Sequence, residues 1–321
     1  MSVLSICSTE TIKSAAIALK NGHLVAFPTE TVYGLGADAT NPEAIARIYA
    51  AKGRPADHPL IVHISSLQEM GQWAQEIPGY AITLARDFWP GPMTLVLKRS
   101  SLAKDFITGG QETIALRVPA HPIALALLNE FVAVGGKGVA APSANRFGAV
   151  SPTTAEAVEE ELAPYLSESD LILNGGQSLV GVESTIIDCT GPAPMILRLG
   201  AITPLMIEES TGLVALASNP AAIRVSGSLD SHYSPKAEVI LDVVAVAGDG
   251  LIAPDQIPTP NGVIRLAAPS TIEEYARTLY TALRSADQQG LSAVVVLQPG
   301  GDGLAAAIRD RLKRSASNKQ V

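Results

Sequence analysis

The feature that most constrains the fold is the alternation of short apolar runs with helical segments through the first two hundred residues. Thr40, Ser66 and Thr153 each precede a Glu by three residues, a spacing that predicts helix starts. Strands interleaved with helices predict a layered α/β domain. The apolar runs are rich in β-branched residues and bounded by Gly, Pro or Asn, which predicts strands at 23–27, 59–64, 93–98, 113–118, 138–141, 170–173, 184–189 and 195–199.

The alternation stops near residue 201 and resumes near residue 238. The intervening segment is rich in Ser, Pro and Gly and has no sustained period, which is typical of a linker or an ordered loop. Beyond it, strands are predicted at 238–244, 262–267 and 293–297, with helices starting near Thr271 and Leu304. A length of 321 residues also favours two domains. We therefore predict a large α/β domain over 1–203, a linker that serves as a lid over 204–237, and a small α/β domain over 238–321.

Net charge and cysteine content narrow the range of possible functions and cellular settings. The net charge of −8 disfavours general nucleic-acid binding, because neutralising phosphates requires a basic surface. The two cysteines, Cys7 and Cys189, have no metal-type spacing and fit a reducing, cytoplasmic setting. We expect no signal peptide and no association with a membrane, because no apolar run approaches the length of a membrane span.

Two polar segments near the start of the chain are candidate ligand sites. In FPTETVYGLG (27–36), a strand runs into Thr29, Glu30 and Thr31, and strand ends in α/β sheets are where ligands usually bind. In KGRP (52–55), two cations one residue apart can grip a polyphosphate. Both segments also have structural interpretations, as a glycine-containing turn and as a helix end with favourable basic residues.

Two later segments carry similar signals. PSANRFGAVSPT (142–153) runs from a strand into a polar loop that can either bind a phosphate or ribose or cap the following helix. Arg117 and Arg198 lie on otherwise apolar strands, where a guanidinium needs a carboxylate or a ligand anion as partner. His63 ends the run LIVHI, and such a histidine is more often a core residue than a catalytic one. Together, the polar strand ends, the arginines and the KGRP loop favour an anionic ligand in a preformed cleft.

The motifs, taken in order, resemble the long two-domain form of the YrdC-like family. The matching blocks are FPTETVYGLGADA, KGRP followed by PLIVHI, PSANRFGAVSPT, GGQSLVGVESTIID and ILRLG. HYSPKA (232–237) is similar to the family's interdomain linker, and GLAAAIRDRLKRSA is similar to the end of its second domain. The resemblance implies a twisted-sheet YrdC-like catalytic domain with a concave, positively lined cavity. It also implies a smaller C-terminal α/β, Rossmann-like domain joined by an ordered linker.

The resemblance also implies an activity and a set of binding residues. The family uses L-threonine, bicarbonate and ATP to make threonylcarbamoyl-AMP and pyrophosphate, a nucleotidyl transfer that serves threonylcarbamoyladenosine modification of tRNA. Its threonine-binding positions fall on Thr31, His63, Arg117, Ala141 and Ser184. His58 stands where the family has Asn, so its contact with the nucleotide is left open. The ATP-binding positions fall on Lys52, Arg54, His58, Thr113, Ser143, Asn145, Ser151, Arg198 and Tyr233.

Cofactors, partners and rival functions complete the expectations. Mg²⁺ is expected to arrive with ATP, without a dedicated ligand cluster, and a downstream tRNA threonylcarbamoyl transferase complex is the expected partner. Direct contact with tRNA is left open. One alternative is an RNA-binding module of the same fold without ATP turnover, which the net charge disfavours. Another is a related carbamoyl-adenylate enzyme, whose acylphosphatase and zinc-binding domains have no counterpart in this sequence.

Overall fold

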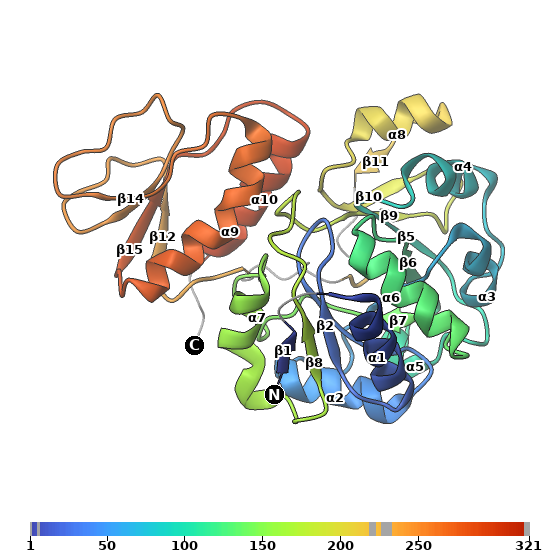
Figure 1. Ribbon diagram of the computed structural model, residues 1–321. Coiled ribbons are helices and arrows are strands. Elements are labelled where there is room, and N and C mark those ends of the chain that lie inside the picture. Colours follow the sequence, from blue (N-terminus) through green and yellow to red (C-terminus); the bar gives the residue numbers. More distant parts are fainter. Residues whose placement is uncertain (1, 5–6, 218–222, 226–232, 318–321) are drawn as a thin grey trace.

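The computed structural model describes residues 2–4, 7–217, 223–225 and 233–317 of the chain. These residues form two α/β bodies built on separate sheets (Figure 1). The larger body carries the N-terminal part of the chain, and the smaller one, drawn in orange and red, carries the C-terminal part. The predicted α/β fold with two sheets is confirmed.

The larger sheet has eleven strands among the described residues, in the order β1-β8-β2-β3-β7-β4-β6-β5-β9-β10-β11. Parallel and antiparallel pairs are mixed, so the sheet is not a doubly wound parallel one. The strands are β1 (Ser2–Leu4), β2 (Val25–Phe27), β3 (Gly34–Asp38), β4 (Ile61–His63), β5 (Met93–Lys98), β6 (Thr113–Arg117), β7 (Val139–Ala140), β8 (Leu171–Leu173), β9 (Thr185–Asp188), β10 (Met195–Arg198) and β11 (Leu216–Ala217).

Strand β3 lies where the sequence suggested only a glycine-containing turn. It runs antiparallel to β2, with Gly36 opposite Val25. A side chain at Gly36 would place its Cβ 2.8 Å from both Phe27 and Val139. Glycine is therefore needed there for close packing rather than for a turn. Strand propensity disfavours glycine, which explains why the sequence pattern did not predict β3.

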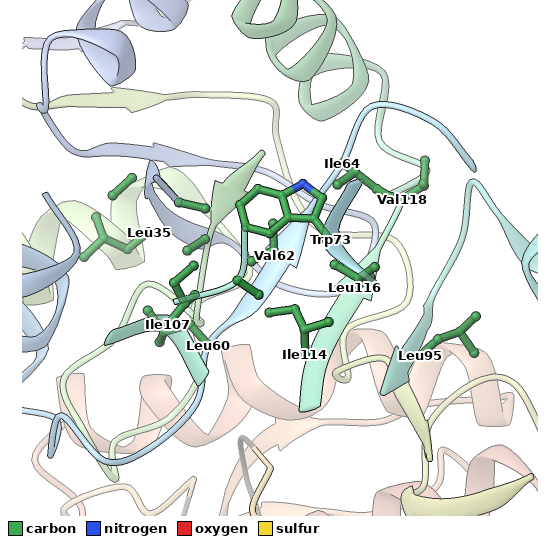
Figure 2. Close-up of a cluster of buried hydrophobic side chains, with 14 of the residues drawn as sticks. Leu35, Leu60, Val62, Ile64, Trp73, Leu95, Ile107, Ile114, Leu116 and Val118 are labelled. Atoms are coloured by element: carbon green, nitrogen blue, oxygen red, sulfur yellow. The ribbon is translucent and has the colours of Figure 1, made fainter. Parts of the chain in front are cut away.

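Helices cover both faces of the larger sheet (Figure 1). On one face α1 packs against α6, and on the other face the main core gathers around Trp73. Figure 2 shows the Trp73 ring among aliphatic side chains that include Val62 and Leu116. The helices are α1 (Thr9–Lys20), α2 (Pro42–Lys52), α3 (Met70–Trp73), α4 (Gly79–Phe88), α5 (Asp105–Thr108), α6 (Pro122–Ala133), α7 (Ala155–Leu162) and α8 (Pro204–Thr211), with 3₁₀ turns η1 (Leu67–Glu69) and η2 (Ala163–Tyr165).

Two helix starts differ by one residue from the sequence prediction. Asn41, not Thr40, caps α2, because its side chain accepts the N–H of Ala44. Thr154, not Thr153, caps α7 in the same way. In both places two neighbouring residues are good N-caps, so spacing alone cannot choose between them. The cap predicted at Thr271 is confirmed by its hydrogen bond from the N–H of Glu274.

The small sheet is entirely parallel, in the order β12-β15-β13-β14. Two helices lie on its side facing the first domain (Figure 1). Part of the packing between the domains is apolar: Val32, Val150 and Val182 belong to the same buried cluster as residues of both helices. The elements are β12 (Glu238–Leu241), β13 (Gly250–Ile252), β14 (Ile264–Ala267), α9 (Ile272–Gln288), β15 (Ala293–Val296) and α10 (Leu304–Ala316).

The segment assigned to the linker, 204–237, contains regular structure at its start. Helix α8 packs on α4, and β11 pairs with β10 in the larger sheet. Further along, Ile223 and Val225 pack against apolar residues of β4, β5 and β9. Residues 218–222 and 226–232, with His232 of the HYSPKA motif, lie outside the described residues. The domain boundaries stay a prediction.

Candidate active site

The parallel pairing of β4 and β6 brings two of the predicted site residues together. Their carboxyl-terminal ends meet at one edge, where His63 lies opposite Arg117. The antiparallel neighbour β7 places Ala141 next to Ile61, at the other end of β4, where the Ala141 N–H donates to the Ile61 carbonyl. The segments that carry His63 and Arg117 therefore converge at one strand end, the usual ligand position in an α/β sheet.

The loop between β2 and β3 holds Thr31 in place. The Thr29 hydroxyl donates to the Val32 carbonyl at 2.6 Å and accepts the N–H groups of Thr31 and Val32. The Thr29 and Thr31 hydroxyl oxygens are 2.8 Å apart. Both side chains are buried. The loop therefore presents fixed hydroxyl groups without needing regular secondary structure.

Arg117 is anchored on one side and leaves one nitrogen for a ligand. Its Nη2 donates to Glu30 Oε1 at 2.6 Å and to the Thr31 hydroxyl at 3.0 Å. Its Nε donates to the Gly91 carbonyl, whereas Nη1 makes no hydrogen bond within the described residues. Glu30 also accepts the N–H of Ala120. The buried guanidinium therefore has a structural carboxylate partner, and its remaining donors can still bind an anion.

Lys52, the last residue of α2, and Arg54, two residues beyond it, lie in different surroundings. Arg54 is buried, donates to the Pro59 carbonyl at 3.0 Å, and has its guanidinium 5.8 Å from the centre of the Phe147 ring. Burial lowers the pKa of Arg54 to about 10, so it stays charged at neutral pH. The Lys52 ammonium instead donates to the carbonyls of Ser143 and Asn145. Burial also lowers the pKa of Lys52 well below its usual value.

The third arginine, Arg198, is bound to the start of β9. Its Nε donates to the Ser184 carbonyl at 3.0 Å, and its Nη2 contacts the Ser184 hydroxyl at 3.1 Å. That hydroxyl lies 2.7 Å from the hydroxyl of Thr94. All three side chains are buried, and burial lowers the pKa of Arg198. The motif at 183–185 thus forms a rigid, polar corner of the site.

His63 contributes a neutral ring. Burial, with the charge of Arg117 as a second cause, lowers the pKa of His63 to about 3. The ring meets Phe27 edge to face, with the ring centres 6.0 Å apart. Its Nδ1 has no hydrogen-bond partner among the described residues. At neutral pH the imidazole is therefore uncharged and can exchange a hydrogen bond with a ligand.

A cavity of about 550 Å³, its open mouth included, joins these groups. Its charged lining consists of three arginines and one carboxylate, Glu183, so it suits an anionic ligand. The predicted site residues that line it are Thr31, Arg54, His63, Arg117, Ala141, Ser143, Ser184, Arg198 and Tyr233.

The remaining predicted residues lie near this cavity without lining it. Lys52 and Asn145 support the 142–145 loop: the Asn145 amide donates to the carbonyls of Arg146 and Ala149. Ser151 donates to Glu183 at 2.7 Å. The remaining two are His58, whose ring meets that of Phe147 edge to face, and Thr113, which lies in a neighbouring hollow with Ile223, Arg224 and Val225.

Sequence reasoning assigned no role to one lining carboxylate and did not identify its partner. The carboxylate is Glu183, directly before Ser184 in the GGQSLVGVESTIID block. It pairs with Arg311 of α10, which is fully buried. The signal was present: Arg311 lies on the same helical face as Ile308, Leu312 and Ser315, all buried. A charged residue on the apolar face of a helix needs a partner, so Arg311 could have been singled out.

Two features, a metal-binding cluster and a membrane-spanning helix, are absent from the described residues. No cluster of three or more His, Cys, Asp or Glu side chains is placed to hold a metal ion there. Within the same residues, no helix has the length and apolar character required to cross a membrane.

The fold and the cavity define a two-domain α/β protein with an arginine-lined cavity whose charge suits a small anionic ligand. Two family models match the chain in succession. Residues 17–200 match the Sua5/YciO/YrdC model, described as "Telomere recombination". Residues 202–317 match a model described as "Threonylcarbamoyl-AMP synthase, C-terminal domain".

Individual relatives agree with the family models. The threonylcarbamoyl-AMP synthase of Pyrococcus abyssi is 38% identical over 97% of this chain and 95% of its own length. That of Bacillus subtilis is 35% identical over 97% of this chain and 94% of its own. The crystal structure of P. abyssi Sua5 complexed with L-threonine superimposes with a TM-score of 0.87, at 37% identity, over 98% of this chain and 96% of that one. The chain belongs to the threonylcarbamoyl-AMP synthase family, and the resemblance to YrdC-like proteins is confirmed.

Proposed function

We propose that this protein condenses L-threonine, bicarbonate and ATP into threonylcarbamoyl-AMP and pyrophosphate, for modification of tRNA in the cytoplasm. The observation that carries the proposal is the cavity where Arg54, Arg117 and Arg198 converge with Thr31 and Ser184. Three guanidinium groups suit the two kinds of anion that the reaction requires, a carboxylate and a polyphosphate. Family membership supplies the reaction class.

The chemistry is proposed to proceed without a covalent enzyme intermediate. The threonine amine attacks bicarbonate with loss of water, or attacks the carbon dioxide that bicarbonate releases and gives up a proton, to form N-carboxythreonine. The new carboxylate attacks the α-phosphorus of ATP, and pyrophosphate leaves. The protein's task in this nucleotidyl transfer is to position the reactants and stabilise charge.

The geometry suggests a role for each group in the threonine half of the cavity. The Nη1 donors of Arg117 suit the threonine carboxylate, since Glu30 and Thr31 already occupy Nη2. The Ser184 hydroxyl faces the same cavity and can orient the amino acid. The neutral ring of His63 can hydrogen-bond to threonine without adding charge.

The nucleotide half uses the other two arginines. Arg54 and Arg198 are proposed to bind the phosphates, with Mg²⁺ supplied together with ATP to neutralise their charge. Lys52 fits a positioning role, because its ammonium already holds the carbonyls of the loop that carries Ser143. The described residues contribute no metal-ligand cluster of their own, so the ion would be held mainly by the phosphates.

The direct test is incubation of the purified protein with ATP, Mg²⁺, threonine and bicarbonate, followed by mass detection of threonylcarbamoyl-AMP. We expect product only when all three substrates are present, because the carboxylate that attacks ATP must first be made from threonine and bicarbonate. Pyrophosphate release that is indifferent to threonine would contradict the proposal. RNA binding without any ATP turnover would favour the alternative of an RNA-binding module.

We further propose that part of the 204–237 segment closes over the cavity when ATP and threonine bind. Tyr233 lines the cavity, and Ile223 and Val225 pack beside it on Ile61. Gln111 accepts the N–H of Arg224 and donates to its carbonyl, which fastens the backbone at that point. Fastened backbone resists proteases, because cleavage requires local opening.

Arg224 provides a specific probe, because it is the only Lys or Arg between residues 199 and 235. We expect ATP plus threonine to slow tryptic cleavage after Arg224 by about ten-fold or more. Gln111→Ala should increase cleavage in the absence of ligands. Equal cleavage rates with and without ligands would show that the segment is only a tether.

A further inference from the structure

Among the described residues that line the cavity, Glu183 is the one charged group whose sign opposes the proposed ligand. It is buried and lines the same cavity as Arg54, Arg117 and Arg198. An uncompensated carboxylate there would repel the phosphates of ATP or pair with an arginine intended for them. The proposed reaction gives this carboxylate no chemical task, so its surroundings must explain its presence.

Most of the hydrogen bonds to Glu183 come from the second domain. Arg311 of α10 donates to Oε2 at 2.9 Å, and the Tyr280 hydroxyl of α9 lies 2.9 Å from the same oxygen. Ser151 of the first domain donates to Oε1 at 2.7 Å. Burial by itself raises the pKa of Glu183, but Arg311 and Arg198 more than offset it and hold the pKa at about 2. The carboxylate is therefore charged at neutral pH, and its charge is compensated across the domain boundary.

Arg311 also contacts two further parts of the cavity wall. Its Nη2 donates to the carbonyl of Leu199, the residue directly after Arg198, at 2.8 Å. Its guanidinium lies 5.4 Å from the centre of the Tyr233 ring, which stacks on Tyr280. One side chain of the second domain thus touches Glu183, the strand end that carries Arg198, and Tyr233.

The backbone around Glu183 is also fitted to the second domain. Val182 is fully buried in the cluster shared with α9 and α10. Gly181 has a φ of +79°, and a side chain there would place its Cβ 2.4 Å from the backbone of Ala276 and Arg277 in α9. The segment that carries Glu183 therefore lies directly on α9, and Arg311 meets the carboxylate at a fixed distance.

We propose that Arg311 is a positioning residue for the adenylation reaction: it compensates Glu183, so that the charge of Arg198 acts on ATP rather than on this carboxylate. The inference rests on the proposed function and extends it to the second domain. Arg198 is the other guanidinium that acts electrostatically on Glu183. Without Arg311, Arg198 becomes the main counterion of Glu183, and the phosphate site loses net positive charge.

The test compares Arg311→Met with the double variant Glu183→Gln/Arg311→Met. We expect Arg311→Met to lower kcat for threonylcarbamoyl-AMP formation and to weaken ATP binding, measured by calorimetry, by about ten-fold each. The double variant should recover ATP binding to within about three-fold of the wild type. Arg309→Met is the matched control, because Arg309 lies on the same helix, donates to the Pro299 carbonyl and does not line the cavity. It should bind ATP as the wild type does.

The pH dependence separates charge compensation from a purely structural role. In Arg311→Met, the groups left around Glu183 are Tyr280 of α9, Arg198 of β10, Ser151 and Tyr233, with Asp310 near on α10. With its main counterion lost, burial raises the pKa of Glu183, so the carboxylate gains a proton as the pH falls. ATP affinity relative to wild type should therefore rise as the pH is lowered from neutral in Arg311→Met, and not in the double variant.

Every result of this comparison either supports or overturns the proposed role of Arg311. Equal ATP affinity in wild type and Arg311→Met overturns the inference, and so does equal impairment of the single and double variants with no pH effect. Thermal denaturation of each variant shows whether the loss follows from unfolding. If the wild type binds ATP but makes no product, the proposed function fails, whereas the ATP-binding comparison still tests Arg311. A wild type that binds no ATP overturns both.

Discussion

Arg54→Ala should lower the rate of threonylcarbamoyl-AMP formation by about 10²–10³-fold while leaving the protein folded. Arg54 lines the cavity and keeps its charge at neutral pH, because burial lowers its pKa only to about 10. A charged donor aimed at developing phosphate charge in a buried site contributes more to the transition state than to the fold. Its hydrogen bond to the Pro59 carbonyl, made by a charged donor, accounts for about 1.5–3 kcal/mol of stability.

The measurement is steady-state product formation, with thermal denaturation of the same samples. Arg99→Ala is the control, because Arg99 pairs with the exposed carboxylates of Asp105 and Glu112 and does not line the cavity. It should keep wild-type activity. Full activity in Arg54→Ala, or an unfolded protein, would show that Arg54 serves the structure rather than the phosphates.

Arg117→Ala should lower the free energy of unfolding by about 3–5 kcal/mol, because it leaves Glu30 buried without its cation. The two side chains are only 5% and 8% exposed, so water does not replace the lost partner. The same variant should lose its stabilisation by threonine, since Arg117 is the proposed partner of the threonine carboxylate. Urea unfolding measures the first effect, and thermal shift with added threonine measures the second.

The double variant Glu30→Gln/Arg117→Met separates these two roles. It removes both charges together, so most of the stability should return. The response to threonine should remain absent, because the carboxylate still has no guanidinium to bind. A double variant that is stabilised by threonine as strongly as the wild type would show that Arg117 is only a structural residue.

The sequence predicted the site best where function depends on strand ends. Thr31, His63 and Ser184 were identifiable because each stands beside the end of a strand: Thr31 follows β2, His63 ends β4 and Ser184 directly precedes β9. The sequence left open whether Arg117 pairs with a carboxylate or with a ligand anion, and the structure identifies a carboxylate partner. Glu30 is the carboxylate, and it comes from a loop 87 residues away in the chain.

The sequence was least informative where a side chain's direction depends on a distant segment. Lys52 and Arg54 look equivalent in the KGRP motif, yet Lys52 turns toward carbonyls at 143 and 145 whereas Arg54 lines the cavity. That difference arises from the 142–145 loop, whose position no local pattern encodes. Glu183 was assigned no role for the same reason, because its partner Arg311 lies 128 residues further on.

The two domains are distinct in sequence, but three valines of the large domain are buried in the core of the small one, so the two domains share part of a core. The core of the small domain is completed by Val32, Val150 and Val182, which belong to the large domain. Fully burying one such side chain contributes about 1.5–3 kcal/mol, so parting the domains would expose apolar surface on both sides. A hinge opening that exposes these valines is therefore costly for this chain. Val32 and Val182 flank Thr31 and Glu183, so the apolar contact that holds the domains together also sets the shape of the site.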